Sequence, residues 1–389
     1  MSGYPEAELL GLPADLVAAG WDEPGALADE LHALEVRAET PGAGLRAMVA
    51  RLGQVGVLGL VTDRAFGGRF PETSFRALAL ARERLGAVSA LADLALTMQG
   101  LGSFPITLAA RQYGDESAKT LLRPIVAGEM VAAFGLTEPE AGTDLGGLAS
   151  TATPAGDGYR LNGEKVYISN AGVADRYVVF AKDTGADGRV SAFVVDADTE
   201  GFEATPMQVL GGHPIGRVHL RDVHVPLAHR LGPAGKGLGL ALGTLSRFRP
   251  TVGAAAVGFA TRALDEALAH VRRREQFGAP LAELPQVQMR LGTMACERDG
   301  ARLLVQRAVA AVDRGEARGV LAYQGSMAKL VATEAAQRVV DSALQLHGGL
   351  GVEEATPVAR LYQDVRSLRI YEGTNDVHPV LIARELLQG

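Results

Sequence analysis

A single carboxylate near the C-terminus stands where one helical pattern ends and another begins. Residues 368–376 read LRIYEGTND and place Glu372 between an aromatic residue and a glycine. The helical pattern of residues 355–370 stops there, and a second pattern covers residues 376–387. A carboxylate held between two rigid elements can point into a cavity, which suits a base that removes a proton from carbon. A solvated helix end, with Gly373 as the C-cap residue, is the alternative interpretation.

Polar donors gather at a second place, where a strand-like segment ends. Residues 133–144 read AFGLTEPEAGTD and carry the hydroxyls of Thr137 and Thr143 around a proline and a glycine. Such a turn presents backbone N–H groups and hydroxyls to the carbonyls of a polar ring or an acyl ligand. A plain strand and turn would need fewer donors, so the pattern indicates a ligand site.

Composition limits the classes of partner. The chain has 389 residues, 47% of them hydrophobic, and a formal charge of −7, which argues against nucleic acid or an anionic membrane as the main partner. The single cysteine, Cys296, excludes an intrachain disulfide and fits a reducing compartment. No apolar run reaches the roughly 18 residues of a membrane span, and residues 1–6 do not resemble a secretory signal. We therefore expect a soluble, cytoplasmic protein.

Metal and hydrolase chemistry find no support in the sequence. His213, His219, His224 and His229 are scattered without the i, i+4 pairing of a zinc helix, so we expect surface or hydrogen-bonded histidines rather than metal ligands. The chain also lacks the Gly-x-Ser-x-Gly motif of a hydrolase nucleophile.

Patterning along the chain predicts an α+β protein of three domains. Residues 1–129 follow a helical pattern with breaks at glycine and proline, among them Gly67-Gly68 and residues 100–105. Residues 130–235 read as a small β domain, and long helical segments return in residues 236–389, where they predict an antiparallel bundle.

Turn residues place the strands of the β domain. The Asn162-Gly163 pair lies within the alternating segment 158–168 and predicts a hairpin with a type I′ turn. A second hairpin is predicted from residues 177–181 and 190–195, and residues 218–225 read as a further strand.

Three long helices are predicted over residues 238–274, 284–314 and 320–346. The last carries small and apolar side chains at steps of three and four, which predict a buried stripe. The stripe contains Ala328, Val331, Ala332, Ala335, Ala336, Val339, Ala343 and Leu346.

Five segments, in this order along the chain, are similar to signature segments of the FAD-dependent acyl-CoA dehydrogenase family. One match alone is weak, but five in order over about 250 residues are specific. The segments are residues 133–144, 167–170 (YISN), 274–278 (REQFG), 345–349 (QLHGG) and 371–374 (YEGT). In the first of them, Thr143 stands where the family usually has serine.

The resemblance implies an N-terminal helical domain, a central β-barrel-like domain and a C-terminal four-helix bundle, assembled as a homotetramer. It implies that FAD lies between the β domain and the bundle, with Tyr167 against the flavin and Ser169 near its N5 atom. A neighbouring subunit is expected to contribute residues that hold the pyrophosphate and adenine. Those residues are Arg274, Phe277, Gln345, Gly348 and Gly349. Further cofactor contacts are expected from Phe134, Leu136, Thr137, Thr143, Thr374 and Asp376.

The resemblance also implies a reaction. Glu372 is expected to take the α-proton of an acyl thioester while flavin N5 accepts the β-hydride. The thioester oxygen is expected between the Glu372 backbone N–H and a ribitol hydroxyl. Enclosure by flavin and acyl chain should raise the Glu372 pKa from its usual value of about 4.3.

Departures from the family pattern concern the carrier of the acyl group. Ser246 stands where an aspartate that contacts the pantetheine arm is usual, whereas Arg249 keeps the expected arginine. Thr143 and Gly373 are further expected substrate contacts. The thioester is expected on CoA, and the missing aspartate leaves an acyl carrier protein as the alternative. Phe248 occupies the position of an alternative base and cannot act as one, which favours Glu372.

Two other functions stay open from the sequence. One is a flavin monooxygenase on the same scaffold, and the other is a flavoprotein or helical scaffold without enzymatic activity. For a dehydrogenase, the resemblance implies an electron-transferring flavoprotein as the electron acceptor.

Overall fold

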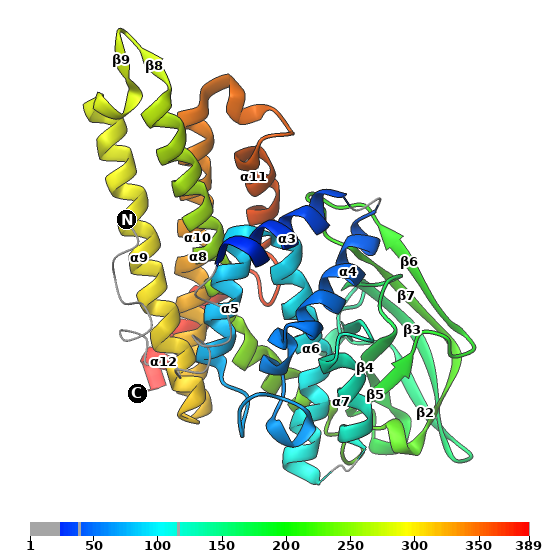
Figure 1. The fold of residues 1–389 in the computed structure, drawn as a ribbon. Helices are drawn as coiled ribbons and strands as arrows, with labels where there is room; N and C mark the ends of the chain where they lie inside the picture. The colour runs from blue at the N-terminus through cyan, green and yellow to red at the C-terminus, as the bar shows by residue number, and fades with distance from the viewer. Residues whose placement is uncertain (1–23, 38–39, 115–116, 389) are drawn as a thin grey trace. The chain divides into compact units, whose positions relative to one another are not determined.

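The computed structural model describes residues 24–37, 40–114 and 117–388 (Figure 1). The chain separates into two compact units. The first contains the described parts of residues 1–33, together with 74–93 and 247–389. The second contains residues 34–73 and 94–246. The described chain begins with α3 (Pro24–Arg37).

Helices build the first unit. Their bounds are α5 Phe75–Val88, α8 Gly237–Arg273 (from residue 247 onward), α9 Pro285–Asp313, α10 Arg318–His347, α11 Pro357–Ser367 and α12 His378–Gln388. Helix α10 packs against α9, α11 and α12 (Figure 1). The predicted stripe is buried at its alanines and at Val339, as small side chains allow, but Val331 is exposed. A short hairpin joins β8 (Glu275–Gln276) to β9 (Ala279–Pro280).

Glycine lets α5 approach α8 closely. A Cβ atom at Gly258 would lie 2.2 Å from the backbone oxygen of Glu83. Because no side chain fits between the two backbones, the neighbouring turns of α5 and α8 are held together. This contact brings Arg82 of α5 to Thr251 of α8.

A seven-stranded sheet and three helices build the second unit. The strands follow the order β1-β4-β2-β3-β7-β6, with β5 paired to β4. Strand β4 is parallel to β1 and β2, and the other pairs are antiparallel. The strands are β1 Ala132–Gly135, β2 Thr151–Ala155, β3 Gly158–Ser169, β4 Arg176–Asp183, β5 Val190–Asp196, β6 Phe202–Met207 and β7 Ile215–Pro226. The helices are α4 Pro41–Gln54, α6 Ala90–Tyr113 (from residue 94 onward) and α7 Ala118–Val126.

Two sequence-based predictions are wrong. Asn162 and Gly163 are not a turn, because β3 runs through them; the hairpin turns at Gly156 and Asp157. Glycine is needed at position 163 for a different reason, since a Cβ there would lie 2.3 Å from the Ser150 hydroxyl. Residues 100–105 do not break a helix, because α6 continues through them. Gly102 instead allows β1 to pack closely against α6, since a Cβ atom added at Gly102 would lie 2.7 Å from the Ala132 Cβ.

Other predicted elements are confirmed. The α+β architecture with a C-terminal helical domain is present, and β4 and β5 form the second predicted hairpin. Strand β7 covers the predicted residues 218–225, and α8, α9 and α10 begin and end within a few residues of their predicted bounds. The three-domain division at 1–129, 130–235 and 236–389 stays a prediction.

A buried lysine in the second unit ties β3 and β4 to the segment that follows β1. The Lys165 side chain is fully buried; its Nζ donates to Glu138 Oε1 at 2.6 Å and to the Phe180 carbonyl oxygen at 2.5 Å. Burial lowers the pKa of Lys165. Burial also raises the pKa of Glu138, but the charge and hydrogen bond of Lys165, together with hydrogen bonds from Ser150 and Ala149, outweigh that effect and lower the pKa of the carboxyl. The contact joins β3 and β4 to the end of β1, next to the predicted ligand residues Thr137 and Tyr167.

Replacing Lys165 by methionine should destabilise the protein strongly. The Lys165→Met variant leaves the Glu138 carboxylate buried without its partner, which costs about 3–5 kcal/mol of unfolding free energy. Urea denaturation followed by far-ultraviolet circular dichroism measures the loss. Lys182→Met, on the partly exposed side of β4, is the matched control and should change stability by less than about 0.5 kcal/mol. Equal stabilities of the two variants would contradict a structural role for the pair.

Candidate functional site

Glu372 lies in the segment between α11 and α12, where the backbone is left-handed. Its φ is 53°, and Gly373 follows with a φ of 93°. A left-handed conformation is ordinary for glycine and strained for glutamate. Strain at a side chain that could do chemistry is typical of functional sites. Helix α11 ends at Ser367 with Leu368 as its C-cap residue, so the interpretation of Gly373 as the C-cap residue is wrong, and Glu372 instead lies in a constrained segment between the two helices.

Three basic side chains hold the carbonyl groups of this segment. Arg249 Nε, on α8, donates to the Glu372 carbonyl oxygen at 3.1 Å. The Gly373 carbonyl oxygen accepts from Lys329 Nζ of α10 at 2.8 Å and from His378 Nε2 of α12 at 3.0 Å. A Cβ at Gly373 would lie 3.2 Å from the His378 ring, so glycine also provides space. Three helices therefore fix the conformation of the two residues.

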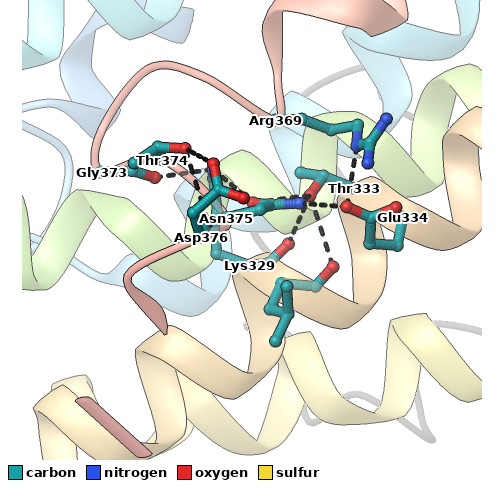
Figure 2. A network of polar contacts seen from close by, with 9 residues as sticks. Lys329, Thr333, Glu334, Arg369, Gly373, Thr374, Asn375 and Asp376 are labelled. Carbon is teal, nitrogen blue, oxygen red and sulfur yellow. Dashed lines mark hydrogen bonds and ion pairs between the residues drawn. The ribbon is translucent and has the colours of Figure 1, made fainter. Parts of the chain in front are cut away.

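Asn375 connects the same segment to α10 (Figure 2). Its side-chain oxygen accepts from Lys329 Nζ at 2.7 Å, and its amide donates to Thr333 Oγ1 at 2.9 Å and to Glu334 Oε1 at 2.8 Å. Arg369 Nε completes the network by donating to Glu334 Oε1 at 2.7 Å. Asn375 is buried, so each of its polar atoms needs a partner, and the network supplies them.

The Glu372 side chain carries the unusual feature of the site. In the part of the chain that the structure describes, its Oε2 atom is buried and has no hydrogen-bond partner. Burial raises the pKa of Glu372 above its ordinary value, although Arg82, Arg249 and Lys329 lower it in part. A buried carboxylate oxygen without a partner is costly unless a ligand uses it. The group can act as a base whose pKa is shifted toward neutrality.

Arg82 supplies a buried positive charge that sequence reasoning missed. It binds Asp93 through two hydrogen bonds of 2.8 and 2.9 Å and Thr251 through one of 2.8 Å. Burial alone would lower the pKa of Arg82, but the Asp93 charge and hydrogen bonds raise it. An available signal was its position on the apolar face of α5, in line with Phe75, Leu78 and Leu85.

Lys329 and His378 were also missed. Burial lowers the pKa of Lys329 to about 8, so the ammonium stays largely charged at neutral pH. Burial, followed by the charges of Arg249 and Lys329, lowers the pKa of His378 to about 4. His378 is therefore a neutral donor, and its bond to the Gly373 carbonyl places the proton on Nε2. Lys329 lies within the predicted apolar stripe of α10, which was the only sequence signal for it.

Predicted site residues of the first unit fall into two groups. Arg249, Gly373, Thr374 and Asp376 lie with Glu372; Thr374 Oγ1 donates to Asp376 Oδ2 at 2.6 Å. A second group is exposed, at the β8–β9 hairpin and at the C-terminal end of α10. Its members are Arg274, Phe277, Gln345, Gly348 and Gly349.

In the second unit the predicted residues gather at the ends of β1 and β3. The Thr137 carbonyl accepts from the Val166 amide at 3.0 Å, which joins the two strand ends. Tyr167 has a φ of 55°, and its side chain is 59% exposed. Ser169 Oγ lies 2.8 Å from His213 Nε2.

The other predicted residues of this unit differ in accessibility. Leu136 is buried, and Phe134 packs against Phe180. Thr143 is exposed, and the Ser246 hydroxyl donates to the Gly243 carbonyl within its own helix.

These residues fit FAD. Large aromatic side chains are seldom left open, yet Tyr167 is 59% exposed and Phe277 is 94% exposed, each in a strained left-handed conformation. An exposed aromatic face is suited to stacking on a flat ring. Arg274 is exposed beside Phe277 and can pair with a pyrophosphate. Among the described residues no cluster of acidic, histidine and cysteine side chains could hold a metal ion, and no helix is long and apolar enough to span a membrane.

Two family models match the chain. The model "Acyl-CoA dehydrogenase, middle domain" matches residues 133–223, and "Acyl-CoA dehydrogenase, C-terminal domain" matches residues 235–387. A 3-(aryl)acrylate reductase of Clostridium sporogenes is 36% identical over 349 residues, covering 88% of this chain and 90% of that protein.

Solved structures agree with the family models. Butyryl-CoA dehydrogenase from Megasphaera elsdenii has a TM-score of 0.81 at 33% identity, covering 87% of this chain and 89% of that chain. Acyl-CoA dehydrogenase complexed with FAD from Bacillus anthracis has a TM-score of 0.82 at 28% identity, covering 94% of this chain and 67% of that chain. The chain therefore belongs to the acyl-CoA dehydrogenase family, FAD-dependent oxidoreductases that act on a CH–CH bond.

Proposed function

We propose that Glu372 is the catalytic base of this dehydrogenase and removes the α-proton of an acyl-CoA thioester. The observation that carries the assignment is the buried Oε2 atom, which has no partner among the described residues and sits on a strained backbone. A side chain held in this way lowers the stability of the protein, and removal of a substrate proton is a function that would explain why it is kept. The family's activity on CH–CH bonds requires such a base.

The surrounding residues prepare the base for this step. Arg249, Lys329 and His378 hold the backbone of residues 372 and 373, so that the carboxylate needs little reorganisation. In the described part of the chain the Glu372 N–H has no partner, and we assign it to the thioester carbonyl oxygen, where negative charge develops. Bound FAD supplies the acceptor for the β-hydride. Glu372 receives the α-proton and becomes a carboxylic acid.

FAD would be held by residues on exposed surfaces. Tyr167 would stack on the flavin and Ser169 would face its N5 atom, together with the ends of β1 and β3. Arg274, Phe277, Gln345, Gly348 and Gly349 would hold the pyrophosphate and adenine of a neighbouring subunit. Exposed apolar side chains of the first unit, such as Met289 (74%), Leu303 (68%) and Leu386 (65%), support assembly, which we propose to be a homotetramer.

We propose acyl-CoA as the substrate form, with Arg249 and Gly373 next to the reacting end. An electron-transferring flavoprotein is proposed as the acceptor of the electrons, as the family resemblance implies. We propose that the protein acts in the cytoplasm.

Exchanging Glu372 for glutamine should stop the reaction while leaving the cofactor bound. The Glu372→Gln variant keeps size and polarity but removes the base, so anaerobic bleaching of FAD by an acyl-CoA panel should slow by about 10²–10⁴-fold. Stopped-flow absorbance measures the rate, and the FAD content is read from the same spectrum. Glu354→Gln, an exposed glutamate of the same unit, is the control and should bleach at the wild-type rate. Undiminished bleaching by Glu372→Gln would remove the assignment.

Removing the Lys329 charge should shift the pH dependence of the base. The ammonium lowers the Glu372 pKa, so Lys329→Met should raise it and move the acid limb of kcat/KM to higher pH. Loss of the bonds to Gly373 and Asn375 should also lower kcat by about 10- to 100-fold. The pH profile of anaerobic reduction measures both effects. Lys329→Arg keeps the charge and should leave the limb closer to its wild-type position; an unmoved limb in Lys329→Met would contradict the electrostatic role.

A further inference from the structure

Ser169 and His213 form a hydroxyl–imidazole pair in the second unit. Ser169 is the last residue of β3, and His213 lies in the connection from β6 to β7. Ser169 Oγ and His213 Nε2 are 2.8 Å apart, a distance typical of a hydrogen bond. The sequence had suggested only that His213 is a surface or hydrogen-bonded histidine, and the pairing gives it a specific partner.

Backbone contacts hold the two residues in place. Ser169 pairs with Ile215 in the β3–β7 ladder, and the Asn170 amide donates to the Pro214 carbonyl oxygen at 2.8 Å. Asn170 is fully buried, and its side chain donates to the Ala132 carbonyl oxygen at 2.9 Å. Because the residues next to Ser169 and His213 are fixed, the pair is part of the framework and not a chance meeting of two mobile side chains.

The imidazole of this pair is neutral. Burial lowers the pKa of His213 to about 4, so at neutral pH one ring nitrogen carries a proton and the other carries a lone pair. The serine hydroxyl has a single proton. If His213 Nε2 accepts that proton, the hydroxyl has none left for a ligand. If Nε2 donates instead, the hydroxyl proton is free to point at a ligand acceptor.

We propose that His213 is a positioning residue for FAD: its Nε2–H donates to Ser169 Oγ and directs the single hydroxyl proton toward the flavin nitrogen that receives the hydride. The inference rests on the proposed function, which places Ser169 beside that nitrogen. A hydroxyl proton at this place stabilises the negative charge that arrives with the hydride. His213 thereby makes FAD easier to reduce without touching the substrate.

The reduction potential of bound FAD tests this proposal directly, because its measurement against reference dyes needs no acyl-CoA. His213→Leu removes the donor, and the equilibrium constant for reduction should fall about tenfold, which is about 30 mV for a two-electron couple. His213→Gln offers an amide N–H at a similar reach and should restore most of the loss. His229→Leu replaces a histidine of the same unit that does not contact Ser169, and should leave the potential unchanged.

A double-mutant cycle separates positioning from packing. Ser169→Ala should lower the potential as His213→Leu does, and the double variant should lower it no further, because both remove the same directed proton. The proposal would be overturned if the two single losses of reduction potential add up in the double variant. It would also be overturned if Ser169→Ala lowers the potential while His213→Leu leaves it equal to that of the wild type. If Ser169→Ala also leaves the potential unchanged, Ser169 does not face the flavin nitrogen and the proposal falls.

Failure to fold is checked separately. If His213→Leu does not retain FAD, His213→Asn serves in its place, since its shorter amide stays polar but cannot reach Ser169; it should show the lowered potential, and a wild-type value would overturn the proposal. Anaerobic bleaching of the wild-type protein by acyl-CoA tests the proposed function independently. An unbleached wild type with the expected potentials would contradict the proposed substrate and leave the role of His213 standing.

Discussion

A carboxylate taken out of water needs positive charge around it, and the first unit is built to meet that need at Glu372. Burial raises its pKa, and Arg82, Arg249 and Lys329 on three different helices offset part of the cost. Too little compensation would leave the acid protonated and unable to act as a base. Full ion pairing would make it too weak a base. Glu372 is not fully ion-paired, because the three cationic side chains direct hydrogen bonds to other groups. Arg249 and Lys329 donate to backbone carbonyls, and Arg82 binds Asp93.

The same contacts explain how a strained loop persists. Left-handed glutamate is unfavourable, and a solvent-exposed loop would relax. Here the carbonyls of residues 372 and 373 are bound by side chains from α8, α10 and α12, and Asn375 ties the next turn to α10. The conformation of the base is therefore a property of the helix packing, and a change on α10 reaches the base without touching it.

In the second unit, the sheet holds the end of β3 rigid and leaves the Tyr167 side chain exposed. Strand β3 contains Tyr167 and ends at Ser169, and the buried Lys165 fixes this part of β3 to β4 and to the segment that follows β1. A rigid strand end can leave an aromatic face open to a flat ligand, at the cost of exposing apolar surface until the ligand binds. His213 adds a directed hydrogen bond at the same edge.

The sequence alone was sufficient for the α+β architecture, the long helices, the β4–β5 hairpin and the segment containing Glu372, because periodicity and short motifs are local signals. It misplaced the turn at Asn162-Gly163 and the break at residues 100–105, since those glycines serve close approaches to Ser150 and Ala132 from elsewhere in the chain. Arg82, Lys329, His378 and the Ser169–His213 pair emerged only from the tertiary structure. Their partners lie from five residues away, as for His378 and Gly373, to 169 residues away, as for Arg82 and Thr251, and no pattern within one segment specifies which charge or carbonyl a buried side chain will meet.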